Sequence, residues 1–335
     1  MAAVSAEKSI WQSATWQSAL APAGPQARVI WHLWQSTFWL CAAVFAAVLA
    51  SVAYAVWRTR SAAQDRPREG AAPLVLRKTH WVIGAALVLS TLGIVSLFAS
   101  DVVASRALRK LTSDDALHIE LTARQWWWRA RYLDAQGNES FTTANELHLP
   151  AGRTVVLDLT SDDVIHSLWL PNLNGKLDLI PGRPAQMRLR ADRPGLYRGQ
   201  CAEFCGLEHA SMALTVTVHS SQDYARWAAA QARPSPVPTA QTPDAVRRGL
   251  QVFIDQHCAQ CHTVRGTAAN GTTGPDLTHF ASRSTLAAGL FPNTRGHRAG
   301  WILDAPALKT GVAMPPVKLT ADDLQALLDY METLQ

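Results

Sequence analysis

Two long stretches without any charged residue constrain this 335-residue chain more than any other feature. No Lys, Arg, Asp or Glu occurs in residues 29–57, and none occurs in residues 81–100. At 1.5 Å per residue, about twenty helical residues cross a hydrocarbon layer about 30 Å thick. The sequence therefore predicts a transmembrane hairpin at residues 31–110, with spans at about 34–57 and 80–100. The alternative is a pair of buried helices in a soluble core.

The connector between the two stretches indicates how the hairpin lies in the membrane. Residues 58–80 contain six Lys or Arg and two acidic residues, which places this loop in the cytoplasm by the positive-inside rule. Both termini, including an N-terminal segment at residues 1–30, are then extracytoplasmic, as in an inner-membrane protein of a bacterium. We expect no cleavable signal peptide, because residues 1–30 contain no continuous apolar stretch.

The distribution of charge argues against a nucleic-acid partner. The net charge of the whole chain is +5, but residues 1–110 alone carry 11 basic and 4 acidic residues. A nucleic-acid-binding domain concentrates its positive charge on a folded surface. The regions that follow the hairpin lack such an excess, so the partner that the basic N-terminal third indicates is the lipid bilayer.

Residues 111–230 have the pattern of an all-β domain. Short apolar runs at residues 146–149, 154–159 and 214–218 alternate with turns that contain Pro and Gly. Regular short strands with such turns are typical of a β-sandwich or a barrel.

A cluster of soft metal ligands lies inside this domain. Residues 201–212 read Cys-Ala-Glu-Phe-Cys-Gly-Leu-Glu-His-Ala-Ser-Met, and His166 lies upstream. Thiolate, thioether and imidazole together are the ligands that copper prefers. One Cys with two His and one Met would make a mononuclear blue-copper site, and the second Cys allows two thiolates to bridge two coppers. A disulfide or a zinc site is the alternative, although zinc has little use for Met.

The C-terminal region contains a second metal motif. A Pro-rich linker at residues 231–242 precedes the domain at residues 243–335. Cys258-Ala-Gln-Cys261-His262 is the signature for covalent haem c, in which His262 is the proximal iron ligand. Helical patterns at residues 244–256 and 319–334 flank the motif and predict an all-α domain.

Residues 148–218 resemble the copper-A cupredoxin domain of subunit II of haem–copper cytochrome c oxidase. The matching pieces are Asp163-Val-Ile-His166, Gly175-Lys-Leu-Asp-Leu-Ile-Pro-Gly-Arg183, Gly195-Leu-Tyr-Arg-Gly-Gln-Cys201 and the metal loop. The resemblance implies a dinuclear copper A held by His166, Cys201, Glu203 through its carbonyl, Cys205, His209 and Met212. It also implies that the Glu203 carboxylate binds a magnesium ion at the interface with subunit I.

Three consecutive tryptophans, Trp126, Trp127 and Trp128, follow the hairpin. Neighbouring residues of a strand point to opposite faces, so the three side chains cannot all share one environment. Packing in the core and at an interface is one interpretation. The resemblance implies that one of them lies beside the copper site and takes part in electron entry, without indicating which one.

The C-terminal domain resembles a class I cytochrome c. The resemblance implies that Met314 is the sixth iron ligand, that the carbonyl of Pro275 orients His262, and that Trp301 lies near the haem propionates. The competing ligands of the right chemical type are Met331, His257, His279 and His297.

The order of hairpin, copper-A domain, linker and cytochrome c resembles subunit II of a caa3-type oxidase. This resemblance implies an electron-entry subunit that carries electrons from cytochrome c or another donor through haem c and copper A to subunit I, which reduces O2 to water and pumps protons. Subunit III is a further implied partner, and no catalytic O2 site lies on this chain. The alternatives are a copper-A subunit of a nitric oxide reductase and a free-standing membrane electron carrier. Residues 79–100 lack the carboxylate that family members often carry there, and His80 is the titratable group at that end.

Overall fold

A computed structural model describes residues 16–62, 72–109 and 115–335 of the chain. Two compact units are present, one formed by residues 28–111 and the other by residues 1–27 together with 112–335. The predictions made for residues 1–15 and for the middle of the basic connector lie outside the described residues.

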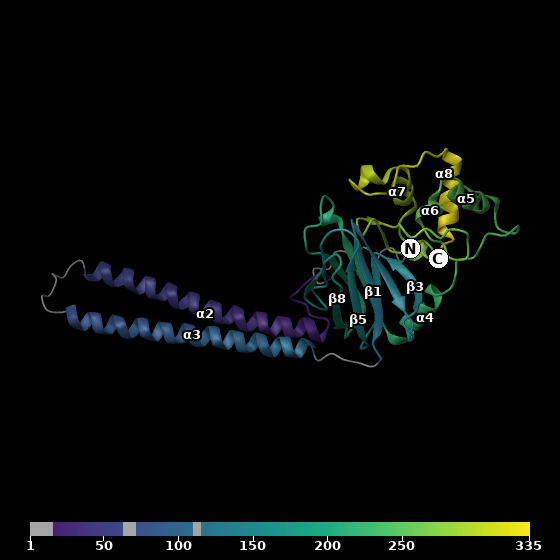
Figure 1. The fold of residues 1–335 in the computed structure, drawn as a ribbon. Helices are drawn as coiled ribbons and strands as arrows, with labels where there is room; N and C mark the ends of the chain where they lie inside the picture. Colours follow the sequence, from purple (N-terminus) through teal and green to yellow (C-terminus); the bar gives the residue numbers. More distant parts are fainter. Residues whose placement is uncertain (1–15, 63–71, 110–114) are drawn as a thin grey trace. The chain divides into compact units, whose positions relative to one another are not determined.

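The first unit is a hairpin of two long helices, α2 (Pro25–Ala62) and α3 (Ala72–Arg109), which run side by side (Figure 1). Each has 38 residues, so the helices extend beyond the predicted spans on both sides. They are close enough that a Cβ on Gly93 would lie 3.7 Å from the Leu40 side chain. A helix needs apolar residues only where it meets lipid, which explains why the apolar pattern is shorter than the helix.

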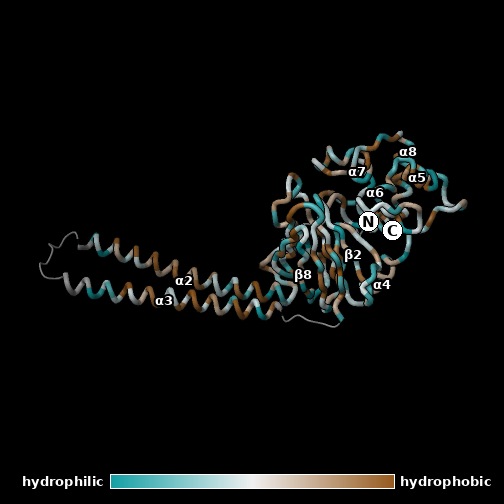
Figure 2. Tube along the Cα trace, in the orientation of Figure 1, coloured by the Kyte–Doolittle hydropathy of each residue, from teal (hydrophilic) through white to brown (hydrophobic). Residues whose placement is uncertain are grey.

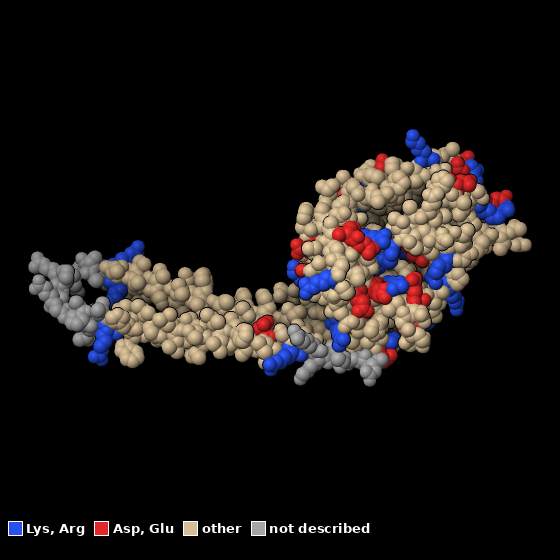
Figure 3. Space-filling model, viewed as in Figure 1, with Lys and Arg blue, Asp and Glu red and all other residues tan. Residues whose placement is uncertain are grey.

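The surface of the hairpin is apolar and exposed. Its candidate membrane spans are Pro25–Arg60 and Arg77–Leu108, and the most apolar 18-residue window of each contains no buried residue. Figure 2 shows the apolar residues along both helices, and Figure 3 shows a long middle section without Lys, Arg, Asp or Glu on the face drawn. A soluble protein could not leave so much apolar surface in water, so these helices are membrane spans rather than core helices.

The second unit begins its folded core with a β-sandwich of two five-stranded sheets (Figure 1). The first sheet has the order β3-β2-β1-β5-β8 and the second has the order β4-β10-β9-β6-β7. The strands are β1 (Leu117–Arg124), β2 (Trp127–Leu133), β3 (Glu139–Ala144), β4 (Glu146–Pro150), β5 (Thr154–Ser161), β6 (His166–Trp169), β7 (Lys176–Leu179), β8 (Ala185–Arg190), β9 (Gly195–Cys201) and β10 (Ala213–His219). The predicted β-sandwich and its three proposed strand positions are confirmed.

Alternation along the strands builds the core between the sheets. In β2 every second residue is buried, and Trp128 and Tyr132 are among the largest side chains fully removed from solvent. They pack with Ile119, Leu121 and Leu157 from the neighbouring strands. This core fixes the ends of the strands, and the proposed metal ligands lie at and beyond those ends.

The segment before the first span packs against the sandwich. The Arg198 amide donates to the Trp16 carbonyl at 2.9 Å, and the Ser18 amide donates to Asn172 Oδ1 at 3.1 Å. Ala23 is buried in the sandwich core and exchanges backbone hydrogen bonds with Asn172 and Asp192. Residues 16–24 therefore belong to the same folded unit as the β-sandwich, which we call the copper-loop domain.

Helix α4 (Ser221–Gln231) follows the sandwich, and a second, smaller core lies beyond residue 243. Its helices are α5 (Asp244–Asp255), α6 (Cys258–Cys261), α7 (Arg295–Leu308) and α8 (Ala321–Glu332), with a short strand pair, β11 (Thr285–Leu286) and β12 (Phe291–Pro292). The all-α class is confirmed, and the described residues add this short strand pair and an isolated bridge between Thr263 and Asn270.

Helices α5 and α8 cross at a glycine. A Cβ on Gly249 would lie 2.0 Å from the Ala326 carbonyl oxygen and 2.6 Å from Tyr330 Cβ, so only glycine permits this approach. Phe253 packs edge-on against Tyr330, with ring centroids 5.9 Å apart. Tyr330 therefore packs against the Gly249 region of α5.

Candidate metal centres

The proposed copper ligands meet at one end of the second sheet. His166 begins β6 and Cys201 ends β9, and the antiparallel pairing of these strands sets Leu168 opposite Cys201. The loop that follows Cys201 returns to its start, because the Cys201 amide donates to the Met212 carbonyl at 2.9 Å. Strand pairing thus brings together His166 and Cys201, which are 35 positions apart in the chain. Closure of the loop brings the remaining donors to them.

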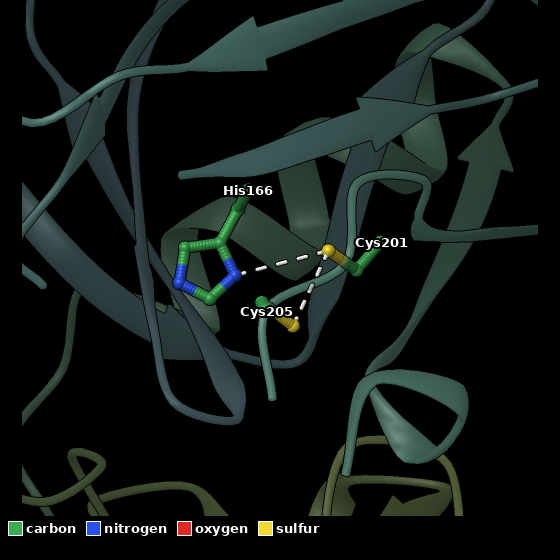
Figure 4. A group of neighbouring side chains, drawn as sticks. All are labelled: His166, Cys201 and Cys205. Carbon is green, nitrogen blue, oxygen red and sulfur yellow. Dashed lines mark hydrogen bonds between the residues drawn. The ribbon is translucent and has the colours of Figure 1, made fainter. Parts of the chain in front are cut away.

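The six proposed donors form a connected group. Cys201 Sγ lies 3.7 Å from His166 Nδ1 and 3.7 Å from Cys205 Sγ, and all three side chains point toward one another (Figure 4). Cys205 Sγ lies 3.6 Å from His209 Nδ1 and 4.0 Å from Met212 Sδ. The backbone oxygen of Glu203 lies 3.2 Å from Cys201 Sγ. The two sulfurs therefore lie in the middle, with the other donors around them.

Asp163 orients the His166 ring. Its carboxylate lies 2.8 Å from His166 Nε2, which leaves Nδ1 facing the sulfurs. Burial on its own raises the pKa of Asp163, but hydrogen bonds from the Gln125 amide, from His166 and from the Val164 amide outweigh it and lower the pKa. Burial lowers the pKa of His166, and its contacts with Cys201 and Asp163 more than reverse that effect. A carboxylate that holds a metal-binding imidazole in this way raises its basicity as a ligand.

The protonation of each thiol depends on the other thiol. The hydrogen bond between them lowers the pKa of Cys201 and raises that of Cys205, since one thiolate is stabilised by its neighbour's S–H. Their separation of 3.7 Å is far beyond a covalent S–S bond. Buried, adjacent thiols with imidazole and thioether around them fit a pair of copper ions, which would displace the remaining protons.

The structure separates the three consecutive tryptophans into different environments. Trp126 is 7% exposed, and its Nε1 donates to the Cys205 carbonyl at 2.9 Å. Trp127 is half-buried, with the Arg129 guanidinium 5.4 Å from its ring centre. Trp128 is fully buried in the core, with its ring 6.4 Å from that of His166. Of the three, Trp126 bonds the copper loop directly.

The haem motif occupies helix α6 and the residue after it. Cys258 and Cys261 are free thiols at the two ends of α6, and His262 follows in extended backbone. His262 Nδ1 lies 2.7 Å from the Pro275 carbonyl, as the resemblance implies, which leaves Nε2 for a metal. A Cβ on Gly274 would lie 2.6 Å from the His262 ring, so this glycine makes room for the imidazole. These residues fit a covalent haem with His262 as its proximal ligand.

Three of the four competitors of Met314 for the sixth position have other partners, and the fourth, His257, is exposed. His279 has both ring nitrogens against carbonyl oxygens, those of Gln335 at 2.6 Å and Arg233 at 3.0 Å. Met331 is buried in the core formed with α8, and His297 Nδ1 bonds Thr294 Oγ1 at 2.7 Å. Met314 is half-buried in a loop, and Trp301 is half-buried on α7.

Two known protein families match this chain. Residues 133–219 match the family described as cytochrome c oxidase subunit II, periplasmic domain, and residues 246–335 match the cytochrome c family. A relative from Alkalihalophilus pseudofirmus, cytochrome c oxidase subunit 2, is 32% identical over 256 residues, covering 76% of this chain and 72% of the relative. This chain belongs to the cytochrome c oxidase subunit 2 family.

Two further relatives carry the same family name. Cytochrome c oxidase subunit 2 of Bacillus subtilis is 29% identical, with 67% of this chain and 64% of that protein covered. The periplasmic domain of subunit II of cytochrome oxidase of Bradyrhizobium japonicum is 29% identical and covers 36% of this chain and 96% of the solved chain, with a TM-score of 0.34.

As a member of this family, the chain is the electron-entry subunit of a cytochrome c oxidase complex and associates with other oxidase subunits. The two family matches, in this order along the chain, support both copper and haem c as cofactors. The two apolar helices and the match to a periplasmic domain fit a membrane protein with extracytoplasmic domains.

The sequence did not predict one group of residues that lies between the two proposed metal centres. Lys309 bonds carbonyl oxygens on both sides of the boundary between the sandwich and the haem region, and Gly311 lies against Trp126. The available sequence signal was weak: Lys309 lies five residues before Met314 in an otherwise uncharged loop. Its partners lie on distant parts of the chain, so no local pattern could have identified the contact.

Proposed function

We propose that this chain accepts electrons at a covalent haem c and delivers them through a dinuclear copper A to subunit I, which reduces O2 to water and pumps protons. One observation carries the proposed route between the two centres. The Trp126 indole donates to the Cys205 carbonyl on one side, and a Cβ on Gly311 would lie 3.1 Å from its ring on the other. Gly311 precedes Met314 by three residues, so one side chain joins the loop of the proposed iron ligand to the copper loop.

The residues of the chain supply the holding and orienting of both groups. When bound, haem c and copper A would each take up and release one electron at a time. Cys258, Cys261, His262 and Met314 would hold the haem, with Pro275 orienting His262 and Trp301 near the propionates. His166, Cys201, Glu203, Cys205, His209 and Met212 would hold the copper pair. Burial of the sulfurs excludes water, which keeps the site from rearranging between its two oxidation states.

The course of the chain into and out of the hairpin supports an orientation in the membrane. Residues 16–24 bond to the sandwich, and the chain continues from them directly into α2 at Pro25. Arg58, Arg60, Arg77 and Lys78 lie at the opposite, connector end. We therefore place the connector in the cytoplasm and both redox domains outside, in the inner membrane of a bacterium.

Three further assignments extend the proposal to partners. Subunit I receives the electrons, subunit III completes the complex, and cytochrome c or another extracytoplasmic carrier donates them. The Glu203 carboxylate, which makes no hydrogen bond or ion pair within the described residues, is a ligand for magnesium at the boundary with subunit I. Proton entry in this oxidase uses subunit I or His80, since the second span contains no carboxylate before Asp101.

The substitution Trp126→Phe tests the route. It retains an aromatic ring but removes the N–H that bonds Cys205, so copper and haem spectra should persist while electron transfer from haem c to copper A slows. The measurement is flash reduction of haem c in the full chain, followed at the copper A absorption band. Trp127→Phe is the matched control and should leave the rate unchanged. Equal rates in both variants would reject Trp126 as the connecting residue.

Metal analysis of the same preparations tests the cofactors themselves. The full chain in detergent, without partner subunits, should contain two coppers for each haem iron. One copper per iron would reject the dinuclear site, and iron without copper would reject copper A altogether. Purification with a large membrane subunit that holds further haem separates the oxidase from a free-standing carrier.

A further inference from the structure

A buried lysine lies at the boundary between the sandwich and the haem region. Only 2% of the Lys309 side chain is exposed, and this is rare for lysine. Its Nζ donates to the Ser211 carbonyl at 2.8 Å, to the Trp126 carbonyl at 2.9 Å and to the Ala287 carbonyl at 3.0 Å. An ammonium has three N–H donors, so every donor is satisfied.

The three acceptors come from both sides of the boundary. Trp126 and Ser211 belong to the sandwich side, and Ser211 directly precedes the proposed copper ligand Met212. Ala287 belongs to the haem region, as Lys309 itself does. The ammonium therefore cross-links two segments next to the copper site with a turn next to the haem core.

The charged group that faces this ammonium comes from the sandwich side. No carboxylate within the described residues forms an ion pair with it, although Glu208 is near enough to favour its charged form. Burial lowers the pKa of Lys309 to about 8, which still leaves the side chain charged at neutral pH. A buried charge held by carbonyl dipoles alone is stable only while all three remain in place.

Neighbouring contacts follow the same boundary. The Thr310 amide donates to Glu208 Oε1 at 3.0 Å, and the Ala213 amide donates to the Ala288 carbonyl at 2.9 Å. Gly311, with φ +83°, lies against the Trp126 ring. Each of these contacts joins one pair of residues, whereas the buried ammonium of Lys309 bonds three segments at once.

We propose that Lys309 is a positioning residue that locks the haem region onto the copper loop, so that the Met314 loop stays against Trp126 between successive electrons. This inference rests on the proposed electron route. Without the lock, the haem region would be held by its linker and the remaining contacts, and it would have to find the copper loop again before each transfer.

The decisive variant is Lys309→Met in the full chain with both cofactors. Methionine keeps the apolar length of the side chain but leaves three buried carbonyls without a donor, which favours separation of the two surfaces. The rate of electron transfer from haem c to copper A should fall about tenfold, because the docked fraction should fall from nearly all molecules to about a tenth of them. The transfer should also become slower as glycerol raises the solvent viscosity, because docking then limits it.

Lys318→Met is the matched control, since Lys318 is exposed, lies in the same region and makes no hydrogen bond or ion pair within the described chain. It should retain the wild-type rate. A Lys309→Met rate equal to that of the control, with intact copper and haem spectra, would overturn the proposal. A wild-type rate that falls in proportion to viscosity would overturn it too, and this measurement decides the matter if the Lys309→Met chain does not assemble.

Hydrogen exchange gives a readout that does not depend on electron transfer. The amides of Thr310 and Ala213 both donate across the boundary, so both should exchange faster in Lys309→Met and remain protected in Lys318→Met. Unchanged protection would contradict the lock. A wild-type chain that binds both cofactors but transfers no electrons between them would instead contradict the proposed function, so the two failures are distinguishable.

Discussion

The copper region and the haem region assemble their ligands in different ways. The copper donors come from the start of β6, the end of β9 and a closed loop, and their sulfurs are buried. The proposed haem-binding residues Cys258, Cys261 and His262 are neighbours in the chain. Copper binding therefore depends on the tertiary structure of the sandwich, whereas haem attachment depends on a local sequence and on covalent chemistry.

The two regions also orient their histidines differently. His166 is held by the carboxylate of Asp163, whereas His262 is held by the carbonyl of Pro275. A carboxylate brings a charge that can be removed by mutation or acid, and a backbone carbonyl cannot be removed by either. The difference indicates that the copper site is the more sensitive of the two to a change in a single side chain outside its ligands.

The largest effect is expected from Asp163→Asn, which tests this sensitivity. Loss of the carboxylate removes the partner that orients His166, so copper affinity should fall about 10- to 100-fold. Competition with a copper chelator measures it, and the haem c spectrum should not change. Asp162→Asn, which removes an exposed partner of Arg124, is the control. A copper affinity within twofold of wild type would reject the orienting role of Asp163.

An intermediate effect is expected from Gly249→Ala, which acts on the haem region alone. The new Cβ would lie 2.0 Å from the Ala326 carbonyl oxygen, so α5 and α8 must separate. Overpacking of this kind costs about 1–3 kcal/mol, which outweighs the helix propensity gained over glycine. Thermal unfolding followed at the haem band measures the loss.

Gly296→Ala in α7 is the matched control, because nothing lies within 4 Å of the added Cβ. It should leave the stability unchanged or raise it slightly. Equal stability in Gly249→Ala and Gly296→Ala would show that the crossing of α5 and α8 tolerates a methyl group. Loss of copper in Gly249→Ala would show that the two regions do not fold independently.

The smallest effect is expected from Asp323→Asn and is confined to acid. Hydrogen bonds from Thr320 and then from Arg248 lower the pKa of Asp323 below its usual 3.8. A lowered pKa stabilises the fold above the ordinary carboxyl pKa, and this contribution is lost as the pH falls through the folded-state value. The stability of the haem region should therefore depend less on pH below about 4 in Asp323→Asn than in wild type.

Asp322→Asn, whose carboxylate makes no hydrogen bond or ion pair within the described residues, should keep the wild-type acid response. Unfolding by denaturant at a series of acidic pH values, followed at the haem band, makes the comparison. An identical acid response in Asp323→Asn and wild type would assign the acid sensitivity to other carboxylates.

Much of the fold and of the haem motif can be predicted from short-range sequence patterns. The two charge-free stretches determine the membrane spans, since lipid demands a continuous run of apolar residues. Strand alternation and Gly/Pro turns determine the sandwich, and Cys258-Ala-Gln-Cys261-His262 determines the haem attachment. The cap of α8 is also local, because Thr320 Oγ1 accepts from the Asp323 amide three residues later. Each of these features arises from residues close together in the chain.

The tertiary structure decided what depends on residues that are far apart. It distinguished Trp126 from Trp127 and Trp128, because only the folded loop shows which ring meets Cys205. It engaged both nitrogens of His279 with backbone carbonyls, which no motif indicates. It also set the ammonium of Lys309 against the carbonyl of Trp126, 183 residues away. The acceptor in this last contact is a backbone oxygen, and every amino acid has one. Only the fold could therefore reveal the contact.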